Sequence, residues 1–561
     1  MAYFPSGRVG AGQKIARTTH DLNRTQSASI VPSFREAHAS LRPKLPISRK
    51  DARKFAQSPL CYKSAGNGTT AQTVTDNITQ RRADEVPSTS QKKEDTFNWL
   101  KQWYPLAAVE DLDPSKPFAT KLLGKDLVIW RDGEQQWRCF EDKCPHRLAP
   151  LSQGRIEPSD GTLQCSYHGW RFSGSGRAAA IPQAAHDSPH VEETACSSKR
   201  SCAATYPTQV ELGLVWVWPE STPEAWLESA AKQPALCQLV RDVDPDKVGL
   251  TTNQNFVRDF PVAFDILFEN ISDQSHVPFA HNGVAYKRAS QWASHFNITN
   301  INKDLKEGEA YTYDLEWSPD AIKPPIQQKV RGVPPAYIEY FTPKEDGKFT
   351  ALWFYVVPLD EHSTRVINHA VIVQPLPGLV KRLAAARPRW IDHLLLNEIF
   401  DGDMAYLAKA SDNAKQRDGF GGTWAQDYFL PAKADGSVLA WRKWFHKEGQ
   451  SGFWAQSGRE AMPAPDLARE QLLDRYHQHT KSCPACSKAL QQLRSGRKVL
   501  LGAAATMGLA VAARLGQGSP VISFGVLGML LGSALCIWLS EKFAGWQSKF
   551  TYSDYDHTAK G

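Results

Sequence analysis

Apolar and polar positions follow two different patterns along this chain. From residue 98 onward, short apolar runs are separated by turns rich in Gly, Pro and Asp, and the runs at 126–130 and 214–218 have the composition of β-strands. Further on, segments with helical periodicity are mixed with strand-like runs such as 351–357. The pattern predicts an α+β protein, with a β-rich domain over 98–225 and a larger mixed domain over 245–430.

One long helix is predicted between residues 390 and 410. Leu395, Ile399, Asp403 and Leu407 recur every four residues, which places Asp403 in the apolar stripe. Asp401 falls on the more polar side of the same helix. A carboxylate on a buried face is costly unless it is paired or bound to a metal, so Asp403 is a candidate ligand.

Two apolar stretches lie near the C-terminus. The first, 499–513, is uncharged but short, and it ends at Arg514; the second, 521–539, is close to the roughly 20 residues that cross a bilayer. Basic residues flank the pair on both sides, so both ends belong on the same side of a membrane. We predict a transmembrane helical hairpin over 498–540, rather than a buried core hairpin, because the second stretch is too long and too apolar. The first stretch could also be interfacial.

Charge is concentrated at the N-terminus. Residues 1–50 hold nine Lys and Arg against two acidic residues, which accounts for the whole formal net charge of +7. No nucleic-acid footprint is therefore needed to explain the basic composition. This segment is rich in Ser and Arg and lacks a secretory apolar core, which predicts an organelle transit peptide over 1–50. Residues 51–97 are predicted to be a flexible linker.

The strongest chemical signal is a pair of short Cys/His clips. Their sequences are Cys144-Pro145-His146-Arg147 and Cys165-Ser166-Tyr167-His168. In a Rieske [2Fe–2S] centre two thiolates hold one iron and two imidazoles hold the other, which suits these four residues. Zinc also accepts two Cys and two His. In zinc sites of that kind, each clip usually carries two Cys or two His. Each clip here carries one Cys and one His, so we predict the iron–sulfur cluster.

A second metal site is predicted downstream. His276 and His281 flank Pro278, which favours a bend or a helix end between them. Two His and a distant carboxylate form the facial triad that holds Fe(II) in non-haem iron oxygenases and leaves positions open for O₂. We predict Asp403 as the carboxylate, with Asp401 as the alternative. Asp273, one turn before His276, could orient that ligand, bridge the two metal sites, or simply cap a helix.

A single Cys-x-x-Cys lies in 431–497, which otherwise has the composition of a linker with a polar helix around 467–477. Cys483 and Cys486 could form a redox-sensitive dithiol, half of a metal site, or a chance pair. The chain has 10 Cys with no framework spacing, which favours a reducing compartment. We find no flavin or NAD fingerprint, so electrons must come from another protein, most simply a ferredoxin.

These motifs together resemble the Rieske non-haem iron oxygenases of the chloroplast branch around pheophorbide a oxygenase, which includes the 55-kDa inner-envelope translocon protein and protochlorophyllide-oxidising relatives. The similarity runs from about residue 99 to the C-terminus. It is carried by the two clips, by the Asp273, His276 and His281 run, and by Asp401-Gly402-Asp403-Met404.

The resemblance implies a helix-grip catalytic domain with an antiparallel sheet, and a homotrimer in which Asp273 links the Rieske domain of one subunit to the iron of the next. It implies a ferredoxin-dependent monooxygenase that uses O₂ to open the ring of pheophorbide a, anchored in a thylakoid or inner-envelope membrane with its catalytic domain in the stroma. It also implies that Cys483 and Cys486 form a thioredoxin-type switch. Two alternatives are a hydroxylase of protochlorophyllide or a phyllobilin, and a redox-sensing component of the protein-import translocon.

Overall fold

The computed structural model describes residues 97–237, 248–284, 295–302, 311–318, 325–374, 377–418, 424–449, 452–456, 465–518, 520–521 and 523–558. The predicted transit peptide, 1–50, and nearly all of the predicted linker, 51–97, lie outside the described residues.

The first domain is built from three small antiparallel sheets. The runs predicted as strands at 126–130 and 214–218 are the cores of β3 and β11. One sheet joins β1 (Tyr104–Ala108), β11 (Leu214–Val217) and β10 (Thr208–Glu211). Another joins β2 (Phe118–Leu122), β3 (Lys125–Arg131), β4 (Trp137–Glu141) and β9 (Thr205–Tyr206). The smallest strands form the third, which comprises β5 (Arg155–Ile156), β6 (Leu163–Gln164), β7 (Arg171–Phe172) and β8 (Ala178–Ala180).

The second domain centres on a seven-stranded antiparallel sheet. Its strands pair in the order β12 (Val248–Phe260), β18 (Thr364–Val373), β17 (Phe349–Pro358), β16 (Tyr337–Pro343), β15 (Ile326–Val333), β14 (Tyr311–Ser318) and β13 (His295–Thr299). Buried and partly exposed positions alternate along β14, as expected for a strand with one face on a core. The sheet confirms the predicted α+β class and its antiparallel catalytic sheet.

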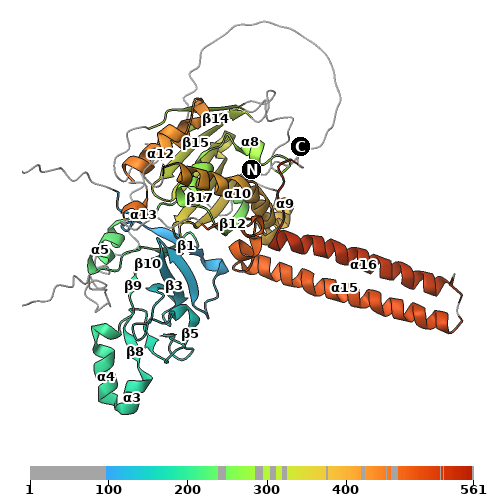
Figure 1. Ribbon diagram of the computed structural model, residues 1–561, viewed down its shortest axis with the longest axis horizontal. Helices are drawn as coiled ribbons and strands as arrows, with labels where there is room; N and C mark the ends of the chain where they lie inside the picture. The colour runs from blue at the N-terminus through green and yellow to red at the C-terminus, as the bar shows by residue number, and fades with distance from the viewer. Residues whose placement is uncertain are drawn as a thin grey trace, which may run out of the picture.

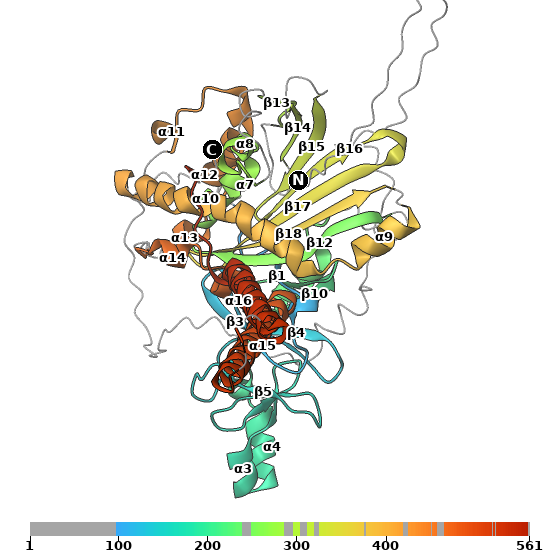
Figure 2. The same ribbon diagram turned by 90° about the vertical axis from the view of Figure 1, so that its right-hand side faces the viewer.

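Three helices support this sheet, directly or through one another. They are α7 (Phe264–Ser272), α12 (Gly436–Lys447) and the long α10 (Arg389–Asp418), which passes the β12 end of the sheet (Figure 2). Shorter helices complete the described domains: α3 (Pro182–Asp187), α4 (Pro189–Ser197), α5 (Pro223–Ala231), α8 (Val277–Ala280), α9 (Gly378–Ala385), α11 (Trp424–Asp427), α13 (Phe453–Gln456) and α14 (Arg469–Leu472).

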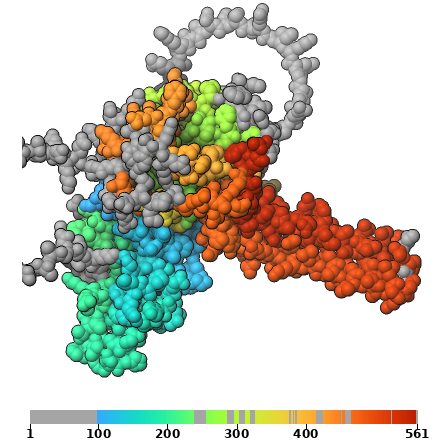
Figure 3. All heavy atoms as spheres, viewed as in Figure 1, coloured from blue at the N-terminus to red at the C-terminus, as the bar shows by residue number. Residues whose placement is uncertain are grey.

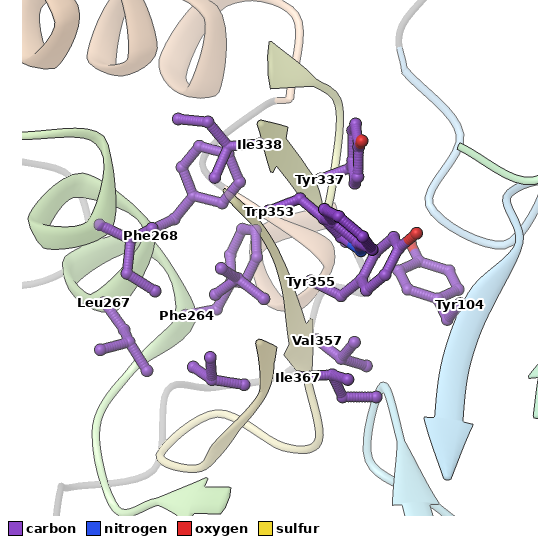
Figure 4. Close-up of a cluster of buried hydrophobic side chains, with 14 of the residues drawn as sticks. Tyr104, Phe264, Leu267, Phe268, Tyr337, Ile338, Trp353, Tyr355, Val357 and Ile367 are labelled. Atoms are coloured by element: carbon purple, nitrogen blue, oxygen red, sulfur yellow. The ribbon is translucent and has the colours of Figure 1, made fainter. Parts of the chain in front are cut away.

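A single hydrophobic cluster joins the two domains. Figure 4 shows Tyr104 of β1 beside Tyr355 of the large sheet, with Phe264 and Phe268 of α7 packed on the same strands. Trp216 of β11 also meets Tyr355 edge to face, with ring centroids 5.1 Å apart. Each fully buried side chain of this size contributes about 1.5–3 kcal/mol relative to an exposed one. The first domain is therefore fixed on the second by core packing.

Residues 431–497 are more structured than a linker. Trp441 of α12 is buried against Phe268 and Phe264 of α7. Trp444 stacks on Trp441, because a spacing of three residues places both rings on one helix face. The polar helix predicted around 467–477 is instead two short pieces, α14 and the one-turn π-helix η9 (Tyr476–Thr480). The linker prediction was wrong for these parts because their apolar residues pack in the core.

The C-terminal hairpin projects from the body of the protein as a two-helix rod (Figures 1 and 3). It consists of α15 (Pro484–Gly516) and α16 (Phe524–Thr551), each long and apolar enough to cross a membrane. Large apolar side chains such as Leu509 and Leu531 are exposed on it. Both helices extend beyond the predicted 498–540, because their polar ends continue the same helices into the base of the hairpin.

Candidate metal centres

The two Cys/His clips adopt the same backbone turn. Cys144 lies on the loop after β4, and Cys165 lies directly after β6. In each clip the amide four residues after the Cys donates to the Cys carbonyl, from Leu148 at 2.9 Å and from Gly169 at 3.0 Å. Both of those residues have a left-handed φ, 62° and 76°. Leu148 tolerates this strained conformation where Gly is the usual choice, so the turn geometry is imposed by the site.

The turns bring the four predicted cluster ligands together. Cys144 and Cys165 are buried free thiols, while the His146 and His168 rings lie 4.6 Å apart nearer the surface. Trp170 stacks on His146 at 4.6 Å and 7°. Partial burial, with help from His168 and Arg147, lowers the pKa of His146 and keeps its imidazole neutral. Two buried thiols beneath two neighbouring imidazoles are a donor set that fits a Rieske cluster.

The second site lies where α7 and α8 meet α10. The backbone leaves helical geometry after Ser272, and His276 and His281 then cap the two ends of the short α8, with Pro278 in its first turn. The side chains converge with Asp403 of α10, so that one ligand atom from each lies within 4.8 Å of the others. Nε2 of His276 is 3.6 Å from Oδ1 of Asp403, and Nε2 of His281 is 3.7 Å from it. Two imidazoles and one carboxylate at these separations fit a mononuclear Fe(II).

Gly402 permits the close approach of α10 to this site. A Cβ at position 402 would lie 3.0 Å from the Ala280 carbonyl oxygen and 3.1 Å from Nδ1 of His281. Tyr555 closes the same region by donating its hydroxyl to the Ala280 carbonyl at 2.9 Å. A helix with any side chain at 402 would have to move away, and it would carry Asp403 with it.

Asp401 and Asp403 are both buried. The prediction that only Asp403 lies on a buried stripe of this helix, with Asp401 on a polar side, was therefore wrong. Leu395 is exposed instead, while Asp401 pairs with Arg258 and Arg475, each through an oxygen 2.7 Å from a guanidinium nitrogen. The four-residue spacing failed because α10 is covered on more than one side. Its polar residues can be buried because distant segments supply partners. Both oxygens of Asp401 are occupied by arginines, whereas Asp403 faces the histidines.

Three polar residues surround the second site. Oδ2 of Asp273 lies 3.5 Å from Nδ1 of His276, and Ser275 donates both its amide and its hydroxyl to the other oxygen at 2.7 Å. Despite burial, these donors lower the pKa of Asp273, so the carboxylate is held ionised beside the imidazole. Tyr406 donates to Asp403 at 2.8 Å, and the Asn270 amide lies 3.4 Å from His276. Sequence reasoning did not identify Tyr406 or Asn270, although Tyr406 follows Asp403 by nearly one helical turn.

Cys483 and Cys486 lie at the beginning of α15, away from both sites. Both are buried free thiols. They meet His393 of α10 and His479 of η9, neither of which the sequence pattern singled out.

Comparison with known proteins gives two family matches and several relatives that align along most of their length. Residues 102–207 match the Rieske [2Fe-2S] domain family, and residues 333–419 match the pheophorbide a oxygenase family. The chain is 34% identical to flavonoid 8-hydroxylase 2 of Ocimum basilicum, over 83% of this chain and 87% of that protein. It is 32% identical to pheophorbide a oxygenase of Oryza sativa subsp. japonica, over 94% and 95%. It is also 32% identical to protochlorophyllide-dependent translocon component 52 of Arabidopsis thaliana, over 82% and 86%.

The fold, the Cys/His site and the His/Asp site therefore define an oxygenase of the Rieske non-haem iron class. Enzymes of this class use a [2Fe–2S] cluster and a mononuclear iron. Within that class, the chain belongs to the pheophorbide a oxygenase-like family. The predicted family, enzyme class and cofactors are confirmed.

Proposed function

We propose that this protein is a ferredoxin-dependent monooxygenase that acts on a chlorophyll-derived tetrapyrrole, most simply by opening the ring of pheophorbide a. The observation that carries the proposal is the convergence of His276, His281 and Asp403 in a chain that aligns along 95% of a pheophorbide a oxygenase. A sensor needs no open iron site, so a complete facial triad favours catalysis over redox sensing.

The residues have distinct proposed roles. Cys144 and Cys165 would hold one iron of the cluster, and His146 and His168 the other. His276, His281 and Asp403 would hold Fe(II) and leave positions open. When bound, the cluster supplies electrons and the iron supplies O₂ activation. Asn270, Tyr406 and Asp273 then fix the orientation of the ligands, because each contacts a ligand side chain or lies within 3.5 Å of one.

Electron transfer between subunits is part of the proposal. The strand β5, next to the clips, and the helix α8 lie at opposite sides of the protein in both ribbon views (Figures 1 and 2). The clip tips expose Leu148 and Tyr167, at 67% and 58%, which a docking surface would cover. A cyclic homotrimer would bring one subunit's clips to the next subunit's Asp273. Ferredoxin is the proposed external donor because the sequence carries no dinucleotide fingerprint.

The hairpin would anchor the enzyme in a chloroplast membrane, either thylakoid or inner envelope. Its flanks carry Arg494, Arg497 and Lys498 on one side and Lys542 and Lys549 on the other. Positively charged flanks tend to stay on the side of the membrane from which they are not translocated, which supports a catalytic domain in the stroma. This orientation gives the clips access to a soluble electron donor.

A hydroxylase is the second candidate function. The relative with 34% identity is named a flavonoid 8-hydroxylase, so this scaffold also supports hydroxylation of an aromatic substrate smaller than a tetrapyrrole. The same iron chemistry serves both reactions, and the difference lies in the substrate pocket. Protochlorophyllide and phyllobilins are further substrates of the hydroxylase type.

A single-turnover assay tests these proposals. Purified, iron-reconstituted protein is mixed with reduced ferredoxin and O₂, and pheophorbide a, protochlorophyllide, a phyllobilin and a flavone are offered in parallel. A ring-opened, oxygenated product from pheophorbide a that is lost in His276→Ala supports the first proposal. Turnover of the flavone or another tetrapyrrole alone would favour the hydroxylase. Redox cycling of the cluster without any product would overturn both in favour of a sensor.

A further inference from the structure

Four metal-binding side chains meet in the interior at the base of the hairpin. His393 comes from the first turns of α10, His479 from η9, Cys483 from the N-cap of α15, and Cys486 from its first turn. All four are at most 2% exposed. Sequence separations of 86 and 90 residues between these groups mean that tertiary folding, and not local spacing alone, assembles the cluster.

Their separations match the edges of a tetrahedron around one zinc ion. With Zn–N of about 2.0–2.1 Å and Zn–S of about 2.3 Å, tetrahedral geometry requires about 3.3 Å between two nitrogens and about 3.6 Å between nitrogen and sulfur. Nε2 of His479 lies 3.2 Å from Nδ1 of His393 and 3.3 Å from Sγ of Cys486. Nδ1 of His393 lies 3.5 Å from each of the two sulfurs. One atom from each residue therefore faces a common centre.

The imidazole of His479 is oriented so that a nitrogen lone pair faces that centre. Nδ1 of His479 lies 2.6 Å from the carbonyl oxygen of Val257, which makes Nδ1 the donor and leaves the Nε2 lone pair facing the cluster. This backbone contact is the kind that orients a metal-ligating histidine.

We propose that His393, His479, Cys483 and Cys486 bind one structural Zn²⁺. Two thiolates and two imidazoles in a tetrahedral arrangement are the donor set that zinc prefers, and thiolate ligands disfavour Mg²⁺ and Ca²⁺. The centre is closed, because four protein ligands fill the tetrahedron and apolar neighbours surround it, including Leu394, Leu490 and Phe550. Two thiolates also neutralise the 2+ charge of the ion.

The zinc would fasten the membrane hairpin to the catalytic domain. Its ligands come from α10, η9 and the beginning of α15, so one ion crosslinks the three elements that meet at the hairpin base. His393 and Asp403 lie on the same helix, about 15 Å apart along its axis. The ion would therefore hold the hairpin at a fixed position relative to the helix that carries a proposed iron ligand. This inference does not depend on the identity of the substrate.

Metal analysis of the full-length protein, purified in detergent, tests the proposal. We expect about one zinc per chain in addition to iron, released stoichiometrically when a mercurial reagent blocks the thiols and detected with a zinc-binding dye. Protein prepared with Co²⁺ should show the visible absorption bands of a tetrahedral site with two sulfur ligands, after subtraction of the cluster spectrum. These measurements use the wild-type chain and do not require a variant to fold.

Variants locate the ion. His479→Ala and the double change Cys483→Ser with Cys486→Ser should each reduce zinc to background, with the cluster absorbance as the measure of retained folding. His477→Ala and Cys196→Ser are the matched controls, because His477 is an exposed His in the same turn and Cys196 is a free Cys elsewhere, and both should retain zinc. The proposal is overturned if wild-type protein with an intact cluster contains no zinc, or if Cys483 and Cys486 form a disulfide reversibly without metal release, as a thioredoxin switch would.

Discussion

Replacing either Asp401 or Asp403 of α10 by asparagine tests which carboxylate stabilises the fold and which one binds iron. Asp401 and Asp403 differ by two positions and are both buried, yet their partners differ completely. Asp401 pairs with Arg258 and Arg475, and Asp403 faces His276 and His281. Asp401→Asn and Asp403→Asn change the same atoms and should give opposite results.

The structure sets the size of the Asp401→Asn effect. Arg258 and Asp401 are 0% exposed and Arg475 is 3% exposed, so removal of the carboxylate charge leaves two buried guanidinium groups without the anion that they share. Breaking a buried ion pair in this way costs about 3–5 kcal/mol. For a domain of this size, about 2–4 °C of melting temperature corresponds to 1 kcal/mol, which predicts a fall of roughly 6–20 °C. Iron bound per folded chain should remain unchanged.

The Asp403→Asn variant should show the reverse behaviour. Asparagine keeps an oxygen that can accept from Tyr406, so the stability of the metal-free chain should change by less than about 1 kcal/mol. Loss of the anionic ligand should lower iron from about three to about two per chain, while the visible spectrum of the cluster is retained.

The assay combines thermal unfolding with iron analysis of the same preparations. Wild type and both variants are compared at equal cluster absorbance, so that differences in cluster loading do not affect the iron count. If Asp401→Asn lost the mononuclear iron while its melting temperature stayed at the wild-type value, Asp401 would be the ligand. The assignment made from the geometry would then be refuted.

Three further predictions follow from single contacts. Gly402→Ala should weaken mononuclear iron binding about 10–100-fold, measured by competition with a chelator, because the added methyl lies within 3.1 Å of the His281 imidazole; unchanged affinity would show that α10 can move without cost. Burial lowers the pKa of His369 to about 4, below its value of about 6.5 in the unfolded chain, so stability should be full above pH 6.5 and fall as the pH is lowered toward 4. His369→Gln should flatten that slope in pH-dependent melting, and an equally steep profile would contradict the assignment. Trp170→Ala removes the ring stacked on His146 and should accelerate bleaching of the cluster in air, whereas a wild-type rate would show that the ring gives no protection.

The cluster ligands could be predicted from sequence because each clip is local. Cys144 and His146 lie two residues apart, and one tight turn decides how both side chains point. Strand β3 was visible for the same reason, since a short apolar run bounded by turn residues is typical of a strand that is buried along its length. Pro278 predicted a bend or a helix end between His276 and His281, and the structure instead has it in the first turn of the short α8. These features depend on short-range geometry, which the order of residues specifies directly.

The remaining features depend on partners that are far away in the chain. Nothing near Asp401 indicates that Arg258 and Arg475 will reach it, and periodicity alone placed this carboxylate on the polar side. His393 could not be connected with Cys483 because 90 residues separate them. In both cases a polar residue is buried because a distant segment satisfies it, and a pattern based on apolar periodicity assigns such residues to the surface.

The buried polar face of α10 explains how anchoring and catalysis share one element. His393, Asn397 and Asp401 are spaced by four residues and form a continuous stripe of fully buried polar groups. His393 meets the thiols at the base of the hairpin, while Asn397 and Asp401 both accept from Arg258 of β12. Asp403 then continues the same helix into the proposed iron site. Because a regular helix transmits rotation and translation along its length, the hairpin, the sheet and the iron ligand cannot shift independently. A displacement of α10 at the base of the hairpin should therefore be detectable at Asp403.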